Sequence, residues 1–132
     1  MKKKGIIVLI VVFVFIALLI GGVSMIAPLA EDQIAELMET PLETLDLSTV
    51  ADGTYRGEVK TIPIHVIVDV VVLNHEITQV VIVKHRSGQG EAANAITEDI
   101  LTHQSADIDA IAGATYSSIA ILIAVMRALE DN

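Results

Sequence analysis

The feature that most limits how this chain can fold is an uncharged stretch from Gly5 to Ala30, which follows three consecutive lysines. A helix needs about 20 apolar residues to cross the hydrocarbon core of a bilayer, so this stretch can span one. A secretory signal has a shorter apolar core of about 7–15 residues and a cleavage site with small residues. A cut after Ala30 would place Pro28 where such a site needs a small residue. We therefore expect residues 1–27 to form an uncleaved transmembrane anchor.

The charges predict an orientation for this anchor. Lys2, Lys3 and Lys4 precede it, and positive residues flanking a span remain in the cytoplasm. We therefore expect a single-pass protein of the cytoplasmic membrane, with its N-terminus inside and its domain outside. Those lysines are three of the eight basic residues, so five remain in the rest of the chain against 17 acidic ones. Such an acidic domain is not expected to bind nucleic acid or anionic lipid surfaces.

The rest of the chain divides into an acidic stalk over residues 28–50 and a domain over residues 51–132. Ile34, Leu37 and Met38 share one face of a short helix in the stalk, and Pro41 ends it. In the domain, alternating valines over residues 64–73 predict a half-buried strand. Two further strands are expected over 53–59 and 77–84, and two helices over 91–102 and 117–129. The expected fold class is α+β: a short antiparallel sheet with two packed helices, preceded by one N-terminal transmembrane helix.

The segment from Asp109 to Ser118 is the best candidate for a binding site. Gly113 can adopt a positive φ and allows a close approach to the backbone. Thr115, Ser117 and Ser118 place hydroxyls where a helix should begin, and the free N–H groups of a helix N-terminus favour a phosphate. A tight turn followed by a hydroxyl-capped helix, without any ligand, explains the same pattern.

This segment resembles the flavinylation signature of FMN-binding domains, which occur in the sodium-pumping quinone reductase, in related electron-transport complexes and in small membrane-anchored proteins. The signature is Asp, two variable residues, Ser or Thr, then Gly-Ala-Thr, and Ala112 stands here at its hydroxyl position. The resemblance covers about the last two-thirds of the chain. It rests on Asp109, Ala112, Gly113, Ala114, Thr115, Asp52, Gly53, Thr54, Tyr55, Gly57, His85, Gly88, Gly90, Ala93, Gln104, Ser105, Ala124, Val125, Ala128 and Leu129.

The resemblance implies that the Thr115 hydroxyl carries FMN through a phosphoester bond. A separate flavin transferase would make the bond with Mg²⁺, taking FMN from FAD and releasing AMP. The transferase would read Asp109; alternatively, Asp109 is an ordinary turn carboxylate that satisfies local N–H groups. Tyr116 would either stack on the flavin ring or simply pack. The predicted cofactor-binding residues are Thr115, Asp109, Gly113, Ala114, Tyr116, Ser117, Ser118, His85, Gly88 and Gly90.

The expected function is that of an electron carrier, which holds FMN covalently and passes electrons between a donor and an acceptor at the membrane or outside the cytoplasm. No acid–base pair for activating a substrate is evident, so a stand-alone enzyme is less expected. The histidines lack the spacing of metal ligands, and the absence of cysteine excludes thiol catalysis, disulfides and Cys-ligated iron–sulfur clusters. Two alternatives stay open: a module that binds FMN without a covalent bond, and a structural subunit without flavin.

Overall fold

The computed structural model describes residues 2–86 and 90–130 and divides into two compact units, Met1–Asp32 and Gln33–Asn132. The first unit consists of most of α1 (Lys2–Glu39), a helix that continues through Pro28 and ends just before Pro41. Within α1, the segment Lys3–Gly22 is 20 residues long and has a mean hydropathy of 3.2. By length and composition, this N-terminal helix can cross a membrane.

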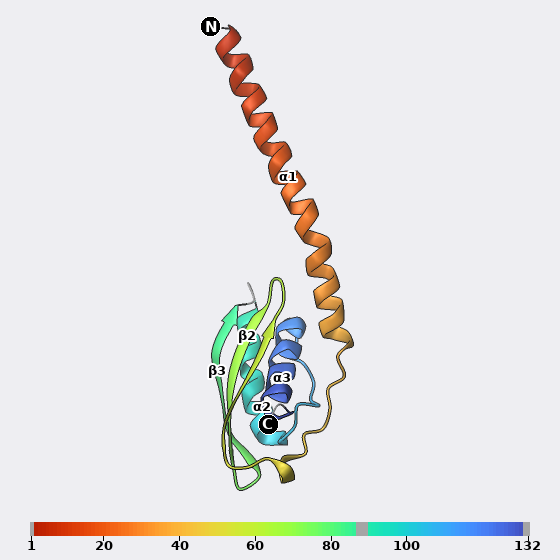
Figure 1. The fold of residues 1–132 in the computed structure, drawn as a ribbon, viewed down its shortest axis with the longest axis vertical. Helices are drawn as coiled ribbons and strands as arrows, with labels where there is room; N and C mark the ends of the chain where they lie inside the picture. Colours follow the sequence, from red (N-terminus) through yellow and green to blue (C-terminus); the bar gives the residue numbers. More distant parts are fainter. Residues whose placement is uncertain (1, 87–89, 131–132) are drawn as a thin grey trace. The chain divides into compact units, whose positions relative to one another are not determined.

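The second unit is built on a three-stranded antiparallel sheet in the order β1-β2-β3 (Figure 1). The strands are β1 (Gly53–Lys60), β2 (His65–Leu73) and β3 (Glu76–Arg86). Asn74 and His75 join β2 to β3 with φ angles of 52° and 63°, the pair of positive φ values that a type I′ hairpin turn requires. Along β2, buried valines alternate with more exposed residues, as the sequence pattern predicts.

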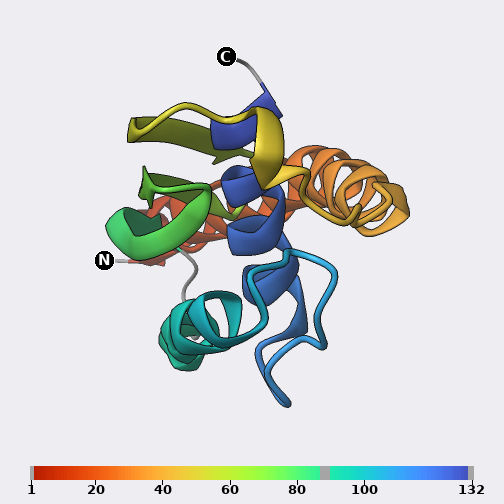
Figure 2. The ribbon, with the colours of Figure 1, turned by 90° about the horizontal axis from the view of Figure 1, so that it is seen from below.

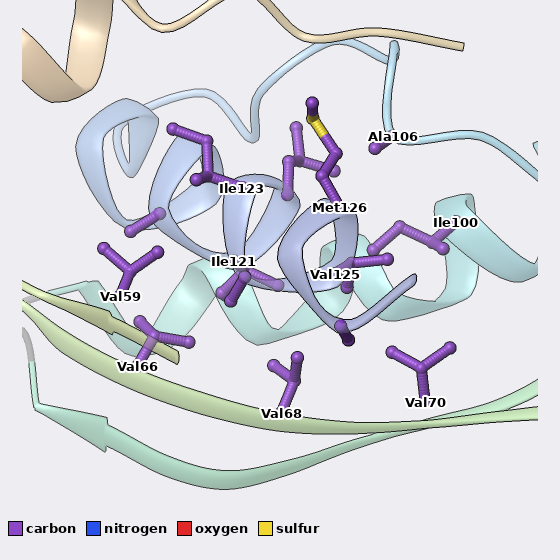
Figure 3. Packing of buried hydrophobic residues seen from close by; sticks show 14 of the residues in the cluster. Val59, Val66, Val68, Val70, Ile100, Ala106, Ile121, Ile123, Val125 and Met126 are labelled. Carbon is purple, nitrogen blue, oxygen red and sulfur yellow. The ribbon is translucent and has the colours of Figure 1, made fainter. Parts of the chain in front are cut away.

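Helices cover one face of the sheet, and the core lies between the two layers (Figures 1 and 2). The 3₁₀ segment η2 (Gly90–Ala95) leads into α2 (Ile96–His103), and α3 (Thr115–Glu130) packs against β1 and β2. Figure 3 shows side chains of α3, including Ile121 and Val125, above the valines of β2. The predicted α+β class is confirmed. The helix predicted over 91–102 begins instead as a 3₁₀ segment.

Glycine lets α3 approach the sheet closely at one point. A Cβ added to Gly57 of β1 would overlap the carbonyl oxygen of Ala124 in α3. A side chain at this position would therefore push the helix off the strand. The candidate binding segment leads into α3 at Thr115, so this contact also helps to position that segment relative to the sheet.

The segment that precedes β1 packs against the same core. Leu37 and Val50 are buried, and Leu42, Leu45 and Leu47 are partly buried against the core cluster. Leu47 begins the short 3₁₀ helix η1 (Leu47–Thr49). The compact unit that contains the domain thus includes the end of α1 and most of the segment expected to be a stalk.

Candidate functional site

A tight turn sets the backbone immediately before α3. The N–H of Ala114 donates to the carbonyl oxygen of Ile111 at 3.0 Å, which closes a four-residue turn. Gly113 occupies the third position of this turn with a φ of 80°. A positive φ at the third position is what a type II turn requires, and glycine adopts it without a steric penalty. Gly113 is therefore needed for its backbone conformation, as the sequence predicts.

The first turn of α3 presents backbone donors that are free to bind a ligand. The N–H of Ser118 donates to the carbonyl oxygen of Ala114 at 2.9 Å. Among the described residues, no acceptor is found for the N–H groups of Thr115, Tyr116 and Ser117. These three donors lie at the positive end of the helix dipole. Together they can hold the oxygen atoms of a phosphate.

Ser118 has a different position from the one expected. Its side chain is fully buried, its hydroxyl donates to the carbonyl oxygen of Ala114 at 2.9 Å, and it accepts the N–H of Ile111 at 3.1 Å. The helix begins at Thr115, two residues earlier than predicted, so Ser118 lies inside it and is not a cap. Its hydroxyl supports the Ile111–Ala114 turn from inside the protein and is not directed at a ligand.

A pocket of about 200 Å³ lies beside this turn. Thr115 and Tyr116 at its edge are exposed, Tyr116 by 52%, whereas Ser117 is buried. Binding pockets for small molecules usually measure about 300–1,000 Å³, so this open pocket can cover only part of a ligand of FMN size. The residues that line it are Ile34, Pro63, Ile64, Gly90, Gly113, Ala114, Thr115, Tyr116 and Ser117.

Three lining residues were missed by the sequence analysis: Ile34, Pro63 and Ile64. Pro63 and Ile64 belong to the loop between β1 and β2, and Ile34 belongs to the end of α1. The only sequence signal for Ile34 was the apolar face it shares with Leu37 and Met38. That face indicated packing against a partner and did not identify the partner.

Besides Ser118, two predicted residues, Asp109 and His85, do not line this pocket. Asp109 is exposed and borders a separate hollow with Asp107 and His103. The Nδ1 atom of His85 lies 2.6 Å from Oδ1 of Asn94. The Nε2 atom of His85 is buried, with no hydrogen-bond partner among the described residues.

The described residues include one of the two glycines predicted in the glycine-rich loop. Gly90 lines the pocket. Gly88 lies outside the described residues. Across residues 2–86 and 90–130, no three His, Cys, Asp or Glu side chains are grouped so that they could hold a metal ion.

The fold and the site define a small α+β domain with a pocket suited to a phosphate-bearing ligand. The family model for the FMN-binding domain matches residues 60–130, which is more than half of the chain. The chain therefore belongs to the FMN-binding domain family, as the sequence signature predicted, and is a flavin-binding module. Neither the curated proteins nor the solved structures contain a match to it.

The residues of the site fit FMN at two points. The free N–H groups of Thr115, Tyr116 and Ser117 suit the phosphate. The apolar side chains of Ile34, Pro63 and Ile64 and the ring of Tyr116 suit the planar flavin.

Proposed function

We propose that this protein carries FMN covalently on Thr115 and serves as an electron carrier outside the cytoplasmic membrane. The observation that carries the proposal is the position of Thr115, which is exposed, begins α3 and borders the pocket. A phosphate esterified to its hydroxyl would remain within reach of the free N–H groups of the same helical turn. Covalent attachment would also keep the cofactor from being lost outside the cell.

A separate flavin transferase is needed to make this bond. An alcohol is a weak nucleophile near neutral pH, and among the described residues no side chain hydrogen-bonds to the Thr115 hydroxyl to activate it. In the proposed step, Oγ1 of Thr115 attacks the phosphorus of the FMN half of FAD. A new P–O bond forms, the bond to the AMP phosphate breaks, AMP leaves, and the hydroxyl proton passes to a base of the transferase. The exposed carboxylate of Asp109 is available for the transferase to recognise.

The redox chemistry of this carrier belongs to the flavin. The protein contributes position through the backbone donors and the apolar side chains that line the pocket. The donor and acceptor are redox partners at the membrane or outside the cytoplasm. Lys3 and Lys4 at the start of α1 support an orientation with the N-terminus inside and the domain outside. Residues 1–27 then serve as the anchor of the compact unit that begins at Gln33 and contains the FMN-binding domain.

Intact-protein mass tests the covalent bond. The full chain, produced together with a flavin transferase, should gain the mass of FMN minus water. Thr115→Ala should abolish this gain and Thr115→Ser should retain it, because serine keeps the attacking hydroxyl. Ser117→Ala is the matched control, since it removes a hydroxyl from the same helical turn and should be flavinylated normally. A Thr115→Ala protein that still gains the mass would overturn the assignment of the attachment site.

Binding of FMN without a covalent bond is the alternative that the structure supports, because the same pocket and N–H groups would serve it. Ala112 favours this alternative, since it is exposed and lacks the hydroxyl that the family signature carries at this position. Fluorescence of the denatured protein in a gel separates the possibilities. A fluorescent band indicates the ester, flavin released on denaturation indicates the module without a bond, and no flavin indicates a structural subunit.

A further inference from the structure

The end of α1 is held against the domain by two contacts. Oε1 of Gln33 accepts the N–H of Ile62 at 2.8 Å, and Leu37 is 4% exposed within the core cluster. Gln33 and Leu37 are four residues apart, so they lie on the same face of the helix. Both belong to the compact unit that contains the sheet and α3. The last turns of α1 are thus part of the domain.

Ile34 lies between these two contacts and lines the pocket with Thr115 and Tyr116. The loop that Gln33 contacts also lines the pocket, through Pro63 and Ile64. That loop is closed by the N–H of Thr61, which donates to the carbonyl oxygen of Ile64 at 2.8 Å. One side of the pocket is therefore formed by a closed loop and by the helix end that is hydrogen-bonded to it.

We propose that the end of α1 is a wall of the flavin pocket and that Ile34 contacts the bound flavin. This inference rests on the proposed function, because it concerns the pocket beside Thr115. Ile34 lies outside residues 60–130, so this wall is not supplied by the part of the chain that matches the family model. Ile34 is apolar, which suits the planar ring of the flavin, while the free N–H groups at the start of α3 suit the phosphate.

The wall has a consequence for the flavin's access to solvent. If the helix end shields one side of the flavin, a change that shortens Ile34 or loosens the helix should expose the flavin to water. Flavin content should not change, because Thr115 and the turn before it are untouched. Shielding and attachment are thus two separable properties of one site.

The experiment compares two substitutions in the last turns of α1, in the full-length flavinylated protein in detergent. Ile34→Ala shortens the wall. Met38→Ala is the matched control, because Met38 is 40% exposed, lies one helical turn further on and does not line the pocket. Quenching of the flavin fluorescence by iodide measures exposure of the flavin. We expect a larger quenching constant in Ile34→Ala and an unchanged one in Met38→Ala, with the mass of both showing full flavinylation.

A second variant, Gln33→Ala, keeps the proposal testable if Ile34→Ala does not fold. Gln33→Ala removes the hydrogen bond to Ile62 and leaves every pocket-lining side chain in place, so it should also increase quenching. If Ile34→Ala and Gln33→Ala both keep the wild-type quenching constant, the proposal that the end of α1 forms a wall of the flavin pocket is wrong.

Failure of the proposed attachment gives a different result, which is an absence of the mass gain in the wild type. In that case free FMN is titrated into the same proteins. Loss of an apolar contact of this size typically costs about tenfold in affinity, so the Kd of Ile34→Ala should rise about tenfold and that of Met38→Ala should not. Equal affinities of the wild type and Ile34→Ala for FMN would overturn the proposal that Ile34 contacts the flavin. A wild type that binds no FMN would overturn both this proposal and the proposed function.

Discussion

The buried hydroxyl of Ser118 supports the turn before α3, and its removal should weaken the site without touching the pocket. In Ser118→Ala, the carbonyl oxygen of Ala114 keeps the N–H of residue 118 as its donor. The N–H of Ile111, in contrast, loses the acceptor that it has at 3.1 Å. Leaving a buried donor unpaired costs about 1–3 kcal/mol, and Ile111 is only half-buried, so we expect a loss of about 1–2 kcal/mol.

The assay is urea unfolding of the full chain in detergent, followed by far-UV circular dichroism. Ser117→Ala is the control, because Ser117 is also buried in the first turn of α3 and its hydroxyl makes no hydrogen bond among the described residues. Both changes replace a buried serine by alanine near the start of the same helix, so the comparison of the two variants reports on the hydrogen bond of Ser118. In thermal unfolding, each 1 kcal/mol corresponds to roughly 4–8 °C for a domain of about 60–100 residues. Equal midpoints for the two variants would refute this account of the turn.

Three further predictions concern the backbone, the sheet and the anchor. Gly113→Ala should destabilise the domain by about 1–2 kcal/mol and reduce flavinylation, because residue 113 has a φ of 80°, and Gly53→Ala is its control in the same two assays. A hydrogen bond from Arg56 lowers the pKa of Asp69 below its ordinary value of 3.8. The ion pair therefore stabilises the fold above pH 3.8, and this stabilisation is lost as the pH falls through the lowered pKa. In Asp69→Asn, the free energy of unfolding should decrease less steeply with falling pH than in the wild type. Protease added outside intact cells, after any outer layer is permeabilised, should remove the domain and spare a cytoplasmic protein; protection of the domain would reverse the proposed topology.

The sheet was predictable from the sequence because its signals are local. Val66, Val68 and Val70 alternate with more exposed residues, and that period places one face of β2 in the core. Asn74 tolerates the positive φ of a two-residue hairpin turn, so the end of β2 followed as well. These features depend on neighbouring residues only, and the structure confirms them.

The start of α3 was predicted two residues late for an identifiable reason. Serine is a favoured N-cap, so Ser117 and Ser118 suggested a helix beginning at Ser117. The actual start is set by the Ile111–Ala114 turn, which leads directly into Thr115. A serine that hydrogen-bonds backward from inside the helix has the same residue type as a cap, and only the fold distinguishes the two.

The residues that line the pocket differ in how the chain specifies them. The part that suits a phosphate comes from one continuous segment, from Ile111 to Ser118, whose turn and helix start are held by hydrogen bonds between near neighbours. A short motif can describe such a structure, so the resemblance to the family pointed to it. The rest of the lining requires Ile34, Pro63 and Gly90 to come together from three separate parts of the chain. No local sequence pattern predicts that these residues lie together, because their approach depends on the docking of the end of α1 and on the closure of the loop between β1 and β2. Substitutions in the motif should therefore change whether flavin is attached, and substitutions in the wall should change how far an attached flavin is exposed.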